Sequence, residues 1–224
     1  MSRKPSRRQA AAISALRKAD PVIATLIDAN PDFDPEAWLS RLPRMDAFGV
    51  LIFQVLGQQL SVAVTRTLLD RLMDRYGDHL PSPEELLATD PEELRAIGLS
   101  RRKVATLREL AERFVDGRLD PEDLQHLPDD EVVARLTEVP GVGPWTADGF
   151  LALALHRDDV VLIGDLALRK AIQSAYKLDH MPTQAEVSQI AEAWRPHRSL
   201  AASYVYASIY NPSPQPNEAA RRRS

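Results

Sequence analysis

The sequence predicts an all-α protein, and three observations support this class. Several prolines precede stretches with helical apolar spacing, which is typical of proline in a first helical turn: Pro21, Pro35, Pro83, Pro91, Pro121 and Pro182. The stretch 61–76 carries apolar residues four apart with charged residues between them. Only 160–163 (VVLI) resembles a strand, and it is too short to build a sheet. We therefore expect roughly ten short helices.

The helix at 61–76 has the clearest boundaries, because Ser61 can cap its start and Gly77 can end it. Other helices are expected, in chain order, at 46–57, 101–116, 129–139, 144–156, 183–194 and 198–210. The segments 46–57 and 144–156 are largely apolar, which favours burial. The tail 211–224 (NPSPQPNEAARRRS) has the composition of a disordered segment.

Composition excludes several classes of protein. The 224 residues include no cysteine, so disulfides, thiolate zinc sites, iron–sulfur clusters and cysteine nucleophiles are excluded. No run of 18 apolar residues could span a membrane. The N-terminus is basic but has no apolar stretch of the kind found in secretory signals. We expect a cytoplasmic protein.

The charge distribution gives a mixed indication about nucleic acid. The net charge is −4, with +6 in residues 1–18 and +2 in residues 211–224, so the residues between them carry −12. An acidic protein is not the usual nucleic-acid binder, for which a basic domain is typical. The two basic ends leave the question open.

The strongest local feature is the segment 136–155 (LTEVPGVGPWTADGFLALAL). A predicted helix breaks at Pro140-Gly141-Val142-Gly143 and a new one starts at Pro144, which describes a tight turn between two helices. The free N–H groups at the start of the second helix can bind an anion. A plain αα-hairpin explains the glycines as well. A dinucleotide site and a P-loop do not fit, because no strand precedes the turn and no Gly-Lys-Ser/Thr follows.

The motif V-P-G-V-G-P-W-T-A resembles the helix–hairpin–helix of the DNA glycosylase superfamily. The resemblance implies that amides of Gly141, Gly143 and Thr146 hold a DNA phosphate. It also implies that backbone carbonyls of Thr137, Val139 and Val142 can hold a structural Na⁺ or K⁺. Binding of a phosphate through backbone amides needs little side-chain charge, so it is compatible with the acidic composition.

The same family places a catalytic aspartate about 20 residues after the hairpin, and Asp165 stands 22 positions after Gly143. Its carboxylate would stabilise positive charge that develops on the sugar as a glycosidic bond breaks. By its local sequence alone, Asp165 is an ordinary N-cap of the next helix, and the two roles are compatible. We interpret Asp158-Asp159 as a solvated loop.

The absence of a lysine in the hairpin and of cysteine in the whole sequence narrows the chemistry that the resemblance implies. Members that also cut the DNA backbone use a lysine two residues after the second hairpin glycine, and that position is Trp145 here. Several other branches carry a four-cysteine cluster, which this chain cannot hold. We therefore expect base excision without strand cleavage, with no catalytic cofactor and no iron–sulfur cluster.

Residues 48–72 resemble the I-x-G-Q-Q-x-S segment of the alkylbase branch, the 3-methyladenine DNA glycosylase II group. The resemblance makes Gln59 the residue that wedges into the DNA stack, with Gln58 and Leu60 beside it. Alternatively, the two glutamines cap the helix at 61. The stretch 96–111 resembles another motif of the branch and implies phosphate contacts by Arg101 and Lys103, although a charge run is more often a solvated face.

Residues 193–210 resemble the W-[RK]-P-x-R-S helix of the family, in which Trp194 and Arg198 are expected to be structural. Tyr206 on this helix, Trp145 and Phe53 are the expected base-pocket residues. Aromatic faces attract a cationic alkylated purine, although core packing is the usual fate of such side chains. The five histidines show no ligand spacing, so no catalytic metal is expected.

Together these features predict a two-lobed helix–hairpin–helix glycosylase fold with the active site between lobes. One lobe would combine residues 1–45 with 166–210, and the other would hold 46–165. The expected function is a monofunctional DNA glycosylase, monomeric and nucleoid-associated if bacterial, that removes alkylated purines from double-stranded DNA. Pocket shape decides among 3-methyladenine, 7-methylguanine, hypoxanthine and ethenoadenine. The alternatives are a non-catalytic DNA-binding module and, less favoured, a protein-interaction bundle.

Overall fold

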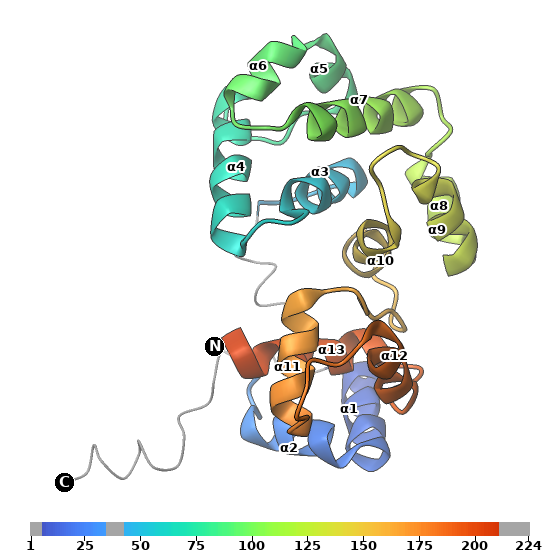
Figure 1. Cartoon of the computed structure of the whole chain (residues 1–224). Coiled ribbons are helices and arrows are strands. Elements are labelled where there is room, and N and C mark those ends of the chain that lie inside the picture. Colours follow the sequence, from blue (N-terminus) through green and yellow to red (C-terminus); the bar gives the residue numbers. More distant parts are fainter. Residues whose placement is uncertain (1–5, 35–42, 211–224) are drawn as a thin grey trace, which may run out of the picture. The chain divides into compact units, whose positions relative to one another are not determined.

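A computed structural model describes residues 6–34 and 43–210 of the chain. Over these residues the protein has thirteen α-helices and no strand, so the predicted all-α class is confirmed (Figure 1). No helix in these ranges is both long enough and apolar enough to cross a membrane. The helix start expected at Pro35 and the tail at 211–224 lie outside the described residues.

The chain folds into two compact units, Pro43–His156 and a second formed by Met1–Leu42 with Arg157–Ser224. We call Pro43–His156 the central unit and the other the terminal unit. The helices of the terminal unit are α1 (Arg7–Ala19), α2 (Pro21–Ala29), α11 (Leu166–Tyr176), α12 (Gln184–Glu192) and α13 (Arg198–Tyr210). The helices of the central unit are α3 (Ala47–Gly57), α4 (Val62–Arg75), α5 (Pro83–Ala88), α6 (Pro91–Ala96), α7 (Arg101–Val115), α8 (Pro121–His126), α9 (Asp129–Thr137) and α10 (Pro144–Leu153).

Local sequence signals set most of the helix starts. Pro21, Pro83, Pro91 and Pro121 each open a helix, as predicted. Pro182 does not, because Thr183 is the N-cap of α12 and the helix begins at Gln184. The predicted cap of α4 is also confirmed, since the Ser61 hydroxyl accepts a hydrogen bond from the Val64 N–H at 3.4 Å. The two glutamines that precede Ser61 therefore do not cap this helix.

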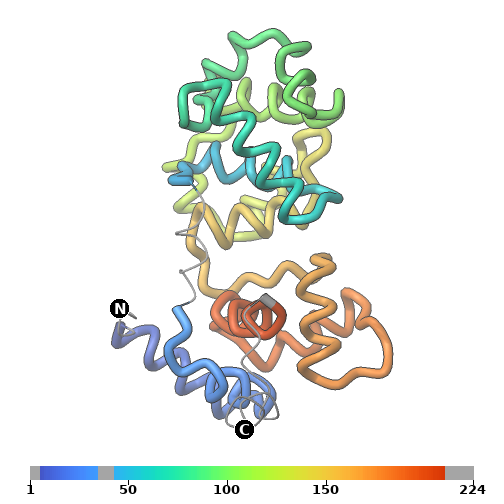
Figure 2. The backbone as a smooth tube through the Cα atoms, turned by 90° about the vertical axis from the view of Figure 1, so that its left-hand side faces the viewer, coloured from blue at the N-terminus to red at the C-terminus, as the bar shows by residue number. Residues whose placement is uncertain are grey.

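The terminal unit joins the two ends of the sequence. α13 packs against both α2 and α11, and Figure 2 shows the blue N-terminal helices beside the red C-terminal one. A buried carboxylate lies in its core: Asp20 caps α2 and also accepts hydrogen bonds from the Trp194 indole at 3.0 Å and from the Tyr176 hydroxyl. Burial raises the pKa of Tyr176, so this hydroxyl stays a donor. Trp194 is fully buried, which confirms its structural role.

The central unit is built around α3, which is apolar on nearly every side. Eight of its eleven residues are buried, and α4, α7 and α10 pack against it. α7 lies between α3 and the short helices α5 and α6 (Figure 1). In α7, the buried residues Val104, Leu107 and Ala111 recur at the spacing of one helical face. Most polar side chains of α7 therefore lie outside this apolar face.

The segment 157–165 differs from its prediction. VVLI at 160–163 is not a strand, and residues 6–34 and 43–210 hold no other strand that could pair with it. The Val160 N–H instead donates to the Ser199 hydroxyl at 3.1 Å, and the Ser199 N–H donates to the Asp158 carbonyl. These contacts with the start of α13 place the segment in the terminal unit, so the units divide at Arg157, whereas the sequence predicted a boundary after Asp165.

Acidic residues are unevenly distributed over the helix starts of the central unit. The first turns of α5, α6, α8 and α9 hold two or three acidic residues each. The first turns of α3, α4, α7 and α10 hold none. Acids are stabilising at a helix N-terminus, where the backbone carries partial positive charge. Nine of the 32 acidic residues of the chain therefore lie in the first turns of four short helices.

Candidate functional site

The predicted helix–turn–helix at 136–155 forms within the central unit. α9 ends at Thr137, the turn runs through Gly143, and α10 begins at Pro144 and packs against α9. α10 ends at Leu153, three residues before the predicted end. The Val142 N–H donates to the Val139 carbonyl at 3.0 Å, which closes the turn.

The two glycines of this turn meet different surroundings. Gly141 has a φ of +95°, and a Cβ there would lie 2.1 Å from the Thr106 hydroxyl oxygen, so the fold itself requires glycine. Gly143 has an ordinary φ of −110°, and a Cβ there would have nothing within 4 Å. The described residues therefore give no packing reason for glycine at position 143, and the turn is open at that point.

Gly143, where the turn is open, is also the start of a helix, α10, that has no side-chain cap. Gly143 is the N-cap of α10 and supplies no side-chain hydrogen bond, while Pro144 at the first helical position has no N–H. Among the described residues, neither the Gly141 nor the Gly143 N–H has a hydrogen-bond acceptor. By contrast, serine hydroxyls cap both α4 and α7. The hairpin thus offers backbone N–H groups and the positive end of a helix dipole to an anion from outside.

The three candidate wedge residues at the turn between α3 and α4 do not behave alike. Gln58 is half-buried, and its side-chain amide donates to the Gly141 carbonyl and to the Thr146 hydroxyl, both at 3.0 Å. Gln59 is exposed and has a φ of +58°, a left-handed conformation that side chains rarely adopt. Leu60 is 40% exposed. The turn therefore presents Gln59 and Leu60 outward and directs Gln58 toward the hairpin.

The other candidate phosphate ligands differ in accessibility. Arg101 is exposed at the start of α7. The Lys103 ammonium donates to the carbonyls of Leu56 at 2.7 Å and Gln58 at 3.2 Å, and burial lowers the pKa of Lys103. The Thr146 side chain is 1% exposed, and its N–H, which the sequence motif assigned to phosphate, already donates to the Gly143 carbonyl at 3.0 Å. Only Arg101 of these three has a side chain that faces solvent.

The candidate aromatic residues are all half-buried, on three helices. Trp145 lies in the first turn of α10, and its ring lies near the end of α3. A Cβ atom placed on Gly57 would be 3.9 Å from the Cη2 atom of Trp145. Phe53 lies one turn before Gly57 on α3. Tyr206 lies on α13 in the terminal unit, packed against its core. Trp145 and Phe53 thus belong to the same unit as the hairpin.

Asp165 is the N-cap of α11, which confirms the local prediction. Its Oδ1 atom accepts a hydrogen bond from the Leu168 N–H at 2.8 Å, and the residue is half-buried. The first turn of α11 holds no other acidic residue. One carboxylate therefore lies at the positive end of this helix.

The prediction of a solvated loop at Asp158-Asp159 is wrong for Asp159. The Arg198 guanidinium donates to its carboxylate at 2.7 Å, as does that of Arg195. Burial alone would raise the pKa of Asp159, but the hydrogen bond and charge of Arg198 outweigh it and hold that pKa low. The Ser199 hydroxyl donates to the Arg157 carbonyl at 2.7 Å. The start of α13 therefore anchors the segment that leads to Asp165.

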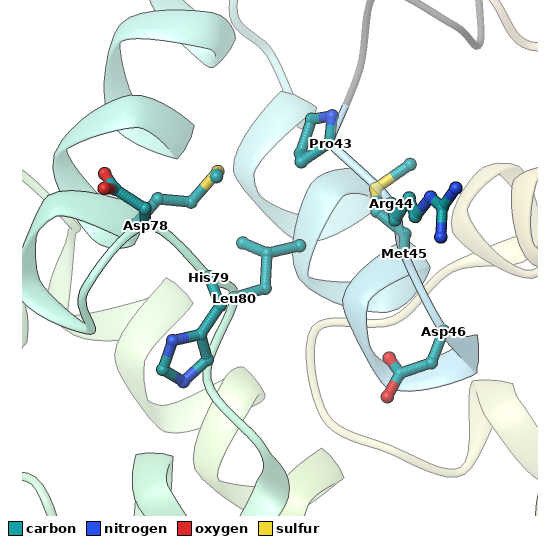
Figure 3. A pocket seen from close by; sticks show the side chains of 8 residues that line it. Pro43, Arg44, Met45, Asp46, Asp78, His79 and Leu80 are labelled. Atoms are coloured by element: carbon teal, nitrogen blue, oxygen red, sulfur yellow. The ribbon is translucent and has the colours of Figure 1, made fainter.

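One pocket of the central unit lies away from these residues. It measures about 490 Å³ and is lined by segments 43–46 and 78–80, which face each other in Figure 3, and by Met73 of α4. None of the candidate site residues lines it. In the described ranges, no three His, Cys, Asp or Glu side chains gather in a way that could hold a metal ion.

Comparison with known proteins adds a family and several relatives. A family model described as HhH-GPD superfamily base excision DNA repair protein matches residues 52–196. DNA-3-methyladenine glycosylase 1 of Schizosaccharomyces pombe is 31% identical over 167 residues, which cover 74% of this chain and 73% of that protein. DNA-3-methyladenine glycosylase 2 of Escherichia coli is 31% identical over 192 residues, which cover 80% of this chain and 63% of that protein.

The fold is likewise similar to solved structures. The S. pombe 3-methyladenine DNA glycosylase Mag1 in complex with abasic DNA has a TM-score of 0.81 and 27% sequence identity, covering 91% of this chain and 98% of that one. The chain spans about three quarters of the S. pombe relative in sequence and less than two thirds of the E. coli one. The matched segment contains the α3–α4 turn, the hairpin and Asp165.

Proposed function

We propose that this chain, which belongs to the HhH-GPD superfamily of base excision DNA repair proteins, is a monofunctional glycosylase that removes alkylated purines from double-stranded DNA. The observation that carries the proposal is the uncapped, open start of α10 at Gly143. The names of its relatives indicate purines of the 3-methyladenine kind.

The hairpin would hold one DNA phosphate. The N–H groups of Gly141 and Gly143 would donate to phosphate oxygens, which would replace the missing side-chain cap of α10. Arg101, exposed at the start of α7, would add one charged contact. This grip depends on backbone groups, so it is compatible with a net charge of −4.

Base flipping requires that a side chain fill the gap in the stack. Gln59 and Leu60 are exposed at the tip of the α3–α4 turn, and we assign the wedge to Gln59. The left-handed backbone at Gln59 suits this role, because a turn whose backbone is already ordered loses little backbone entropy on insertion.

Asp165 would stabilise the transition state. As the bond from C1′ to the base nitrogen breaks, the electron pair leaves with the alkylated base and positive charge develops on the sugar. The carboxylate opposes that charge, and water adds to C1′ and gives up a proton. In the central unit, Trp145 and Phe53 would stack on the cationic base. Tyr206 is assigned to the base by its sequence motif alone. Trp145 occupies the position of the lyase lysine, so an abasic site is the expected product.

The turn also offers a place for a monovalent ion. The carbonyls of Thr137, Val139 and Val142 lie at the end of α9 and in the turn after it, where the helix dipole is negative. Carbonyl oxygens are suitable ligands for Na⁺ or K⁺. The Val139 carbonyl already accepts the Val142 N–H, so an ion there would reinforce the existing turn.

The test is release of free bases from methylated duplex DNA, separated by chromatography. Asp165→Asn keeps an N-cap side chain but removes the charge, and it should lower base release about a hundredfold or more while DNA binding persists. Asp120→Asn is the matched control, because Asp120 caps α8 in the same way. Binding of abasic DNA without release by the wild type would instead favour a non-catalytic DNA-binding module.

A further inference from the structure

Two side chains assigned to DNA by their sequence motifs point into the protein. Gln58 and Lys103 belong to segments 45 residues apart, and both make hydrogen bonds at the α3–α4 turn. A third polar side chain, Thr106, lies one helical turn after Lys103 and is 3% exposed. We call Gln58, Lys103 and Thr106 the brace.

Lys103 holds the end of α3. Its ammonium bonds to the carbonyls of Leu56 and Gln58, and the second of these belongs to the peptide that leads into Gln59. A cation at a helix C-terminus is favourable, because the last carbonyls have no helical partners. The ammonium therefore stabilises the backbone just where Gln59 adopts its left-handed φ of +58°.

Thr106 holds the hairpin from the same face of α7. Its hydroxyl donates to the Pro140 carbonyl at 2.9 Å and lies where a side chain at position 141 would be. Lys103 and Thr106 thus tie one rigid helix to two separate turns, the α3–α4 turn and the hairpin.

Gln58 joins these two turns directly. Its amide donates one hydrogen bond to the Gly141 carbonyl and one to the Thr146 hydroxyl, both at 3.0 Å. The three side chains therefore close a circuit of hydrogen bonds through α7, the α3–α4 turn and the hairpin. Such a circuit restricts the relative movement of the two turns.

We propose that the brace sets the position of Gln59 relative to the hairpin amides, and that Lys103 is a positioning residue and not a phosphate ligand. This inference rests on the proposed function, in which one turn grips a phosphate while the other enters the stack. The distance between these two points must match the distorted DNA. Loosening the brace would leave phosphate binding nearly intact and impair wedge insertion.

The salt dependence of DNA binding separates a phosphate ligand from a positioning residue. Arg101→Met and Lys103→Met change two residues in the first turn of the same helix. Arg101→Met should lower the slope of log affinity against log salt by about 0.9, the value for one lost phosphate contact, and Lys103→Met should leave the slope unchanged.

Wedge insertion can be followed by 2-aminopurine placed next to an abasic analogue in duplex DNA, with protein at saturation. Lys103→Met should reduce the fluorescence change that reports unstacking, and should slow single-turnover base release about tenfold to a hundredfold. Arg101→Met should reach the wild-type amplitude. A lower salt slope for Lys103→Met with normal amplitude, or no change in any measurement, would overturn the proposal.

Further variants keep the test decisive if Lys103→Met does not fold. Thr106→Val removes the hydrogen bond to Pro140, whereas Thr106→Ser keeps it, so only the valine variant should lose fluorescence amplitude. Equal amplitudes for both would overturn the role of Thr106. If the wild type binds DNA but releases no base, the proposed reaction is wrong and the fluorescence measurement still decides on the brace. A wild type that binds no DNA overturns both.

Discussion

Replacement of Gly141 by alanine should strongly destabilise the central unit. The backbone there has a φ of +95°, and the left-handed region costs a residue with a side chain about 1–2 kcal/mol. The new methyl carbon would lie 2.1 Å from the Thr106 oxygen, so Thr106 must move. Overpacking of this kind costs about 1–3 kcal/mol, and loss of the hydrogen bond from Thr106 to Pro140 costs about 1 kcal/mol. We expect a total of about 3–6 kcal/mol.

Gly143→Ala is the matched control two residues away. With an ordinary φ and no atom within 4 Å of the added methyl group, it should change the free energy of unfolding by less than about 0.5 kcal/mol. The methyl group would nevertheless occupy the space proposed for the phosphate. Binding of abasic DNA should therefore weaken at least about tenfold, or about 1.4 kcal/mol.

Urea unfolding, followed by circular dichroism and by tryptophan fluorescence, measures the stability of both variants. The double variant Gly141→Ala with Thr106→Ala removes the overlap but not the strained φ, and it loses the Thr106 hydrogen bond only once. The two changes should therefore be non-additive by about 2–4 kcal/mol. A Gly141→Ala protein within 1 kcal/mol of the wild type would refute this reasoning. So would equal destabilisation by Gly143→Ala, or additivity in the double variant.

Two further predictions concern the terminal unit. The Thr183 backbone N–H, His180 and the Thr183 hydroxyl lower the pKa of Glu186 to about 2, so its stabilising contribution is present above pH 4.5 and is lost as the pH falls from there toward 2. The difference in Tm between the wild type and Glu186→Gln should shrink over that range, and a constant difference would contradict the assignment. Asp20→Ala removes the cap of α2 and the carboxylate that accepts from both the Trp194 indole and the Tyr176 hydroxyl, so the indole keeps only the Tyr176 oxygen at 3.2 Å. It should cost about 3–5 kcal/mol in urea unfolding, and Asp20→Asn should cost less.

Signals that act within a few residues were readable from the sequence. Proline at a first helical position, or a serine or aspartate just before a helix, acts through the adjacent backbone. The all-α class, the cap at Ser61 and the hairpin at 140–144 were therefore predictable. The strand-like VVLI segment did not alter the predicted class, because β-branched residues favour a strand only where a partner strand exists.

Contacts between segments far apart in the chain could not be predicted from the sequence. Gln58 and Lys103 each stand in a motif with exposed neighbours, and only the fold shows that the hairpin and the α3–α4 turn surround them. The pair of Asp159 with Arg198 joins residues 39 apart in the same way. The aspartate doublet resembles a solvated loop until the arginine is placed beside it. A single sequence carries no signal for either contact.

The uneven distribution of acids over the helix starts bears on how the protein encounters a polyanion. In the central unit, a phosphate that approaches α5, α6, α8 or α9 meets carboxylates, whereas one that approaches α4, α7 or α10 meets none in the first turn. For a DNA-binding protein, this arrangement makes misoriented encounters short-lived, since repulsion at the wrong helix start favours dissociation. The carboxylates at these four helix starts would then discriminate among orientations of the protein on the duplex.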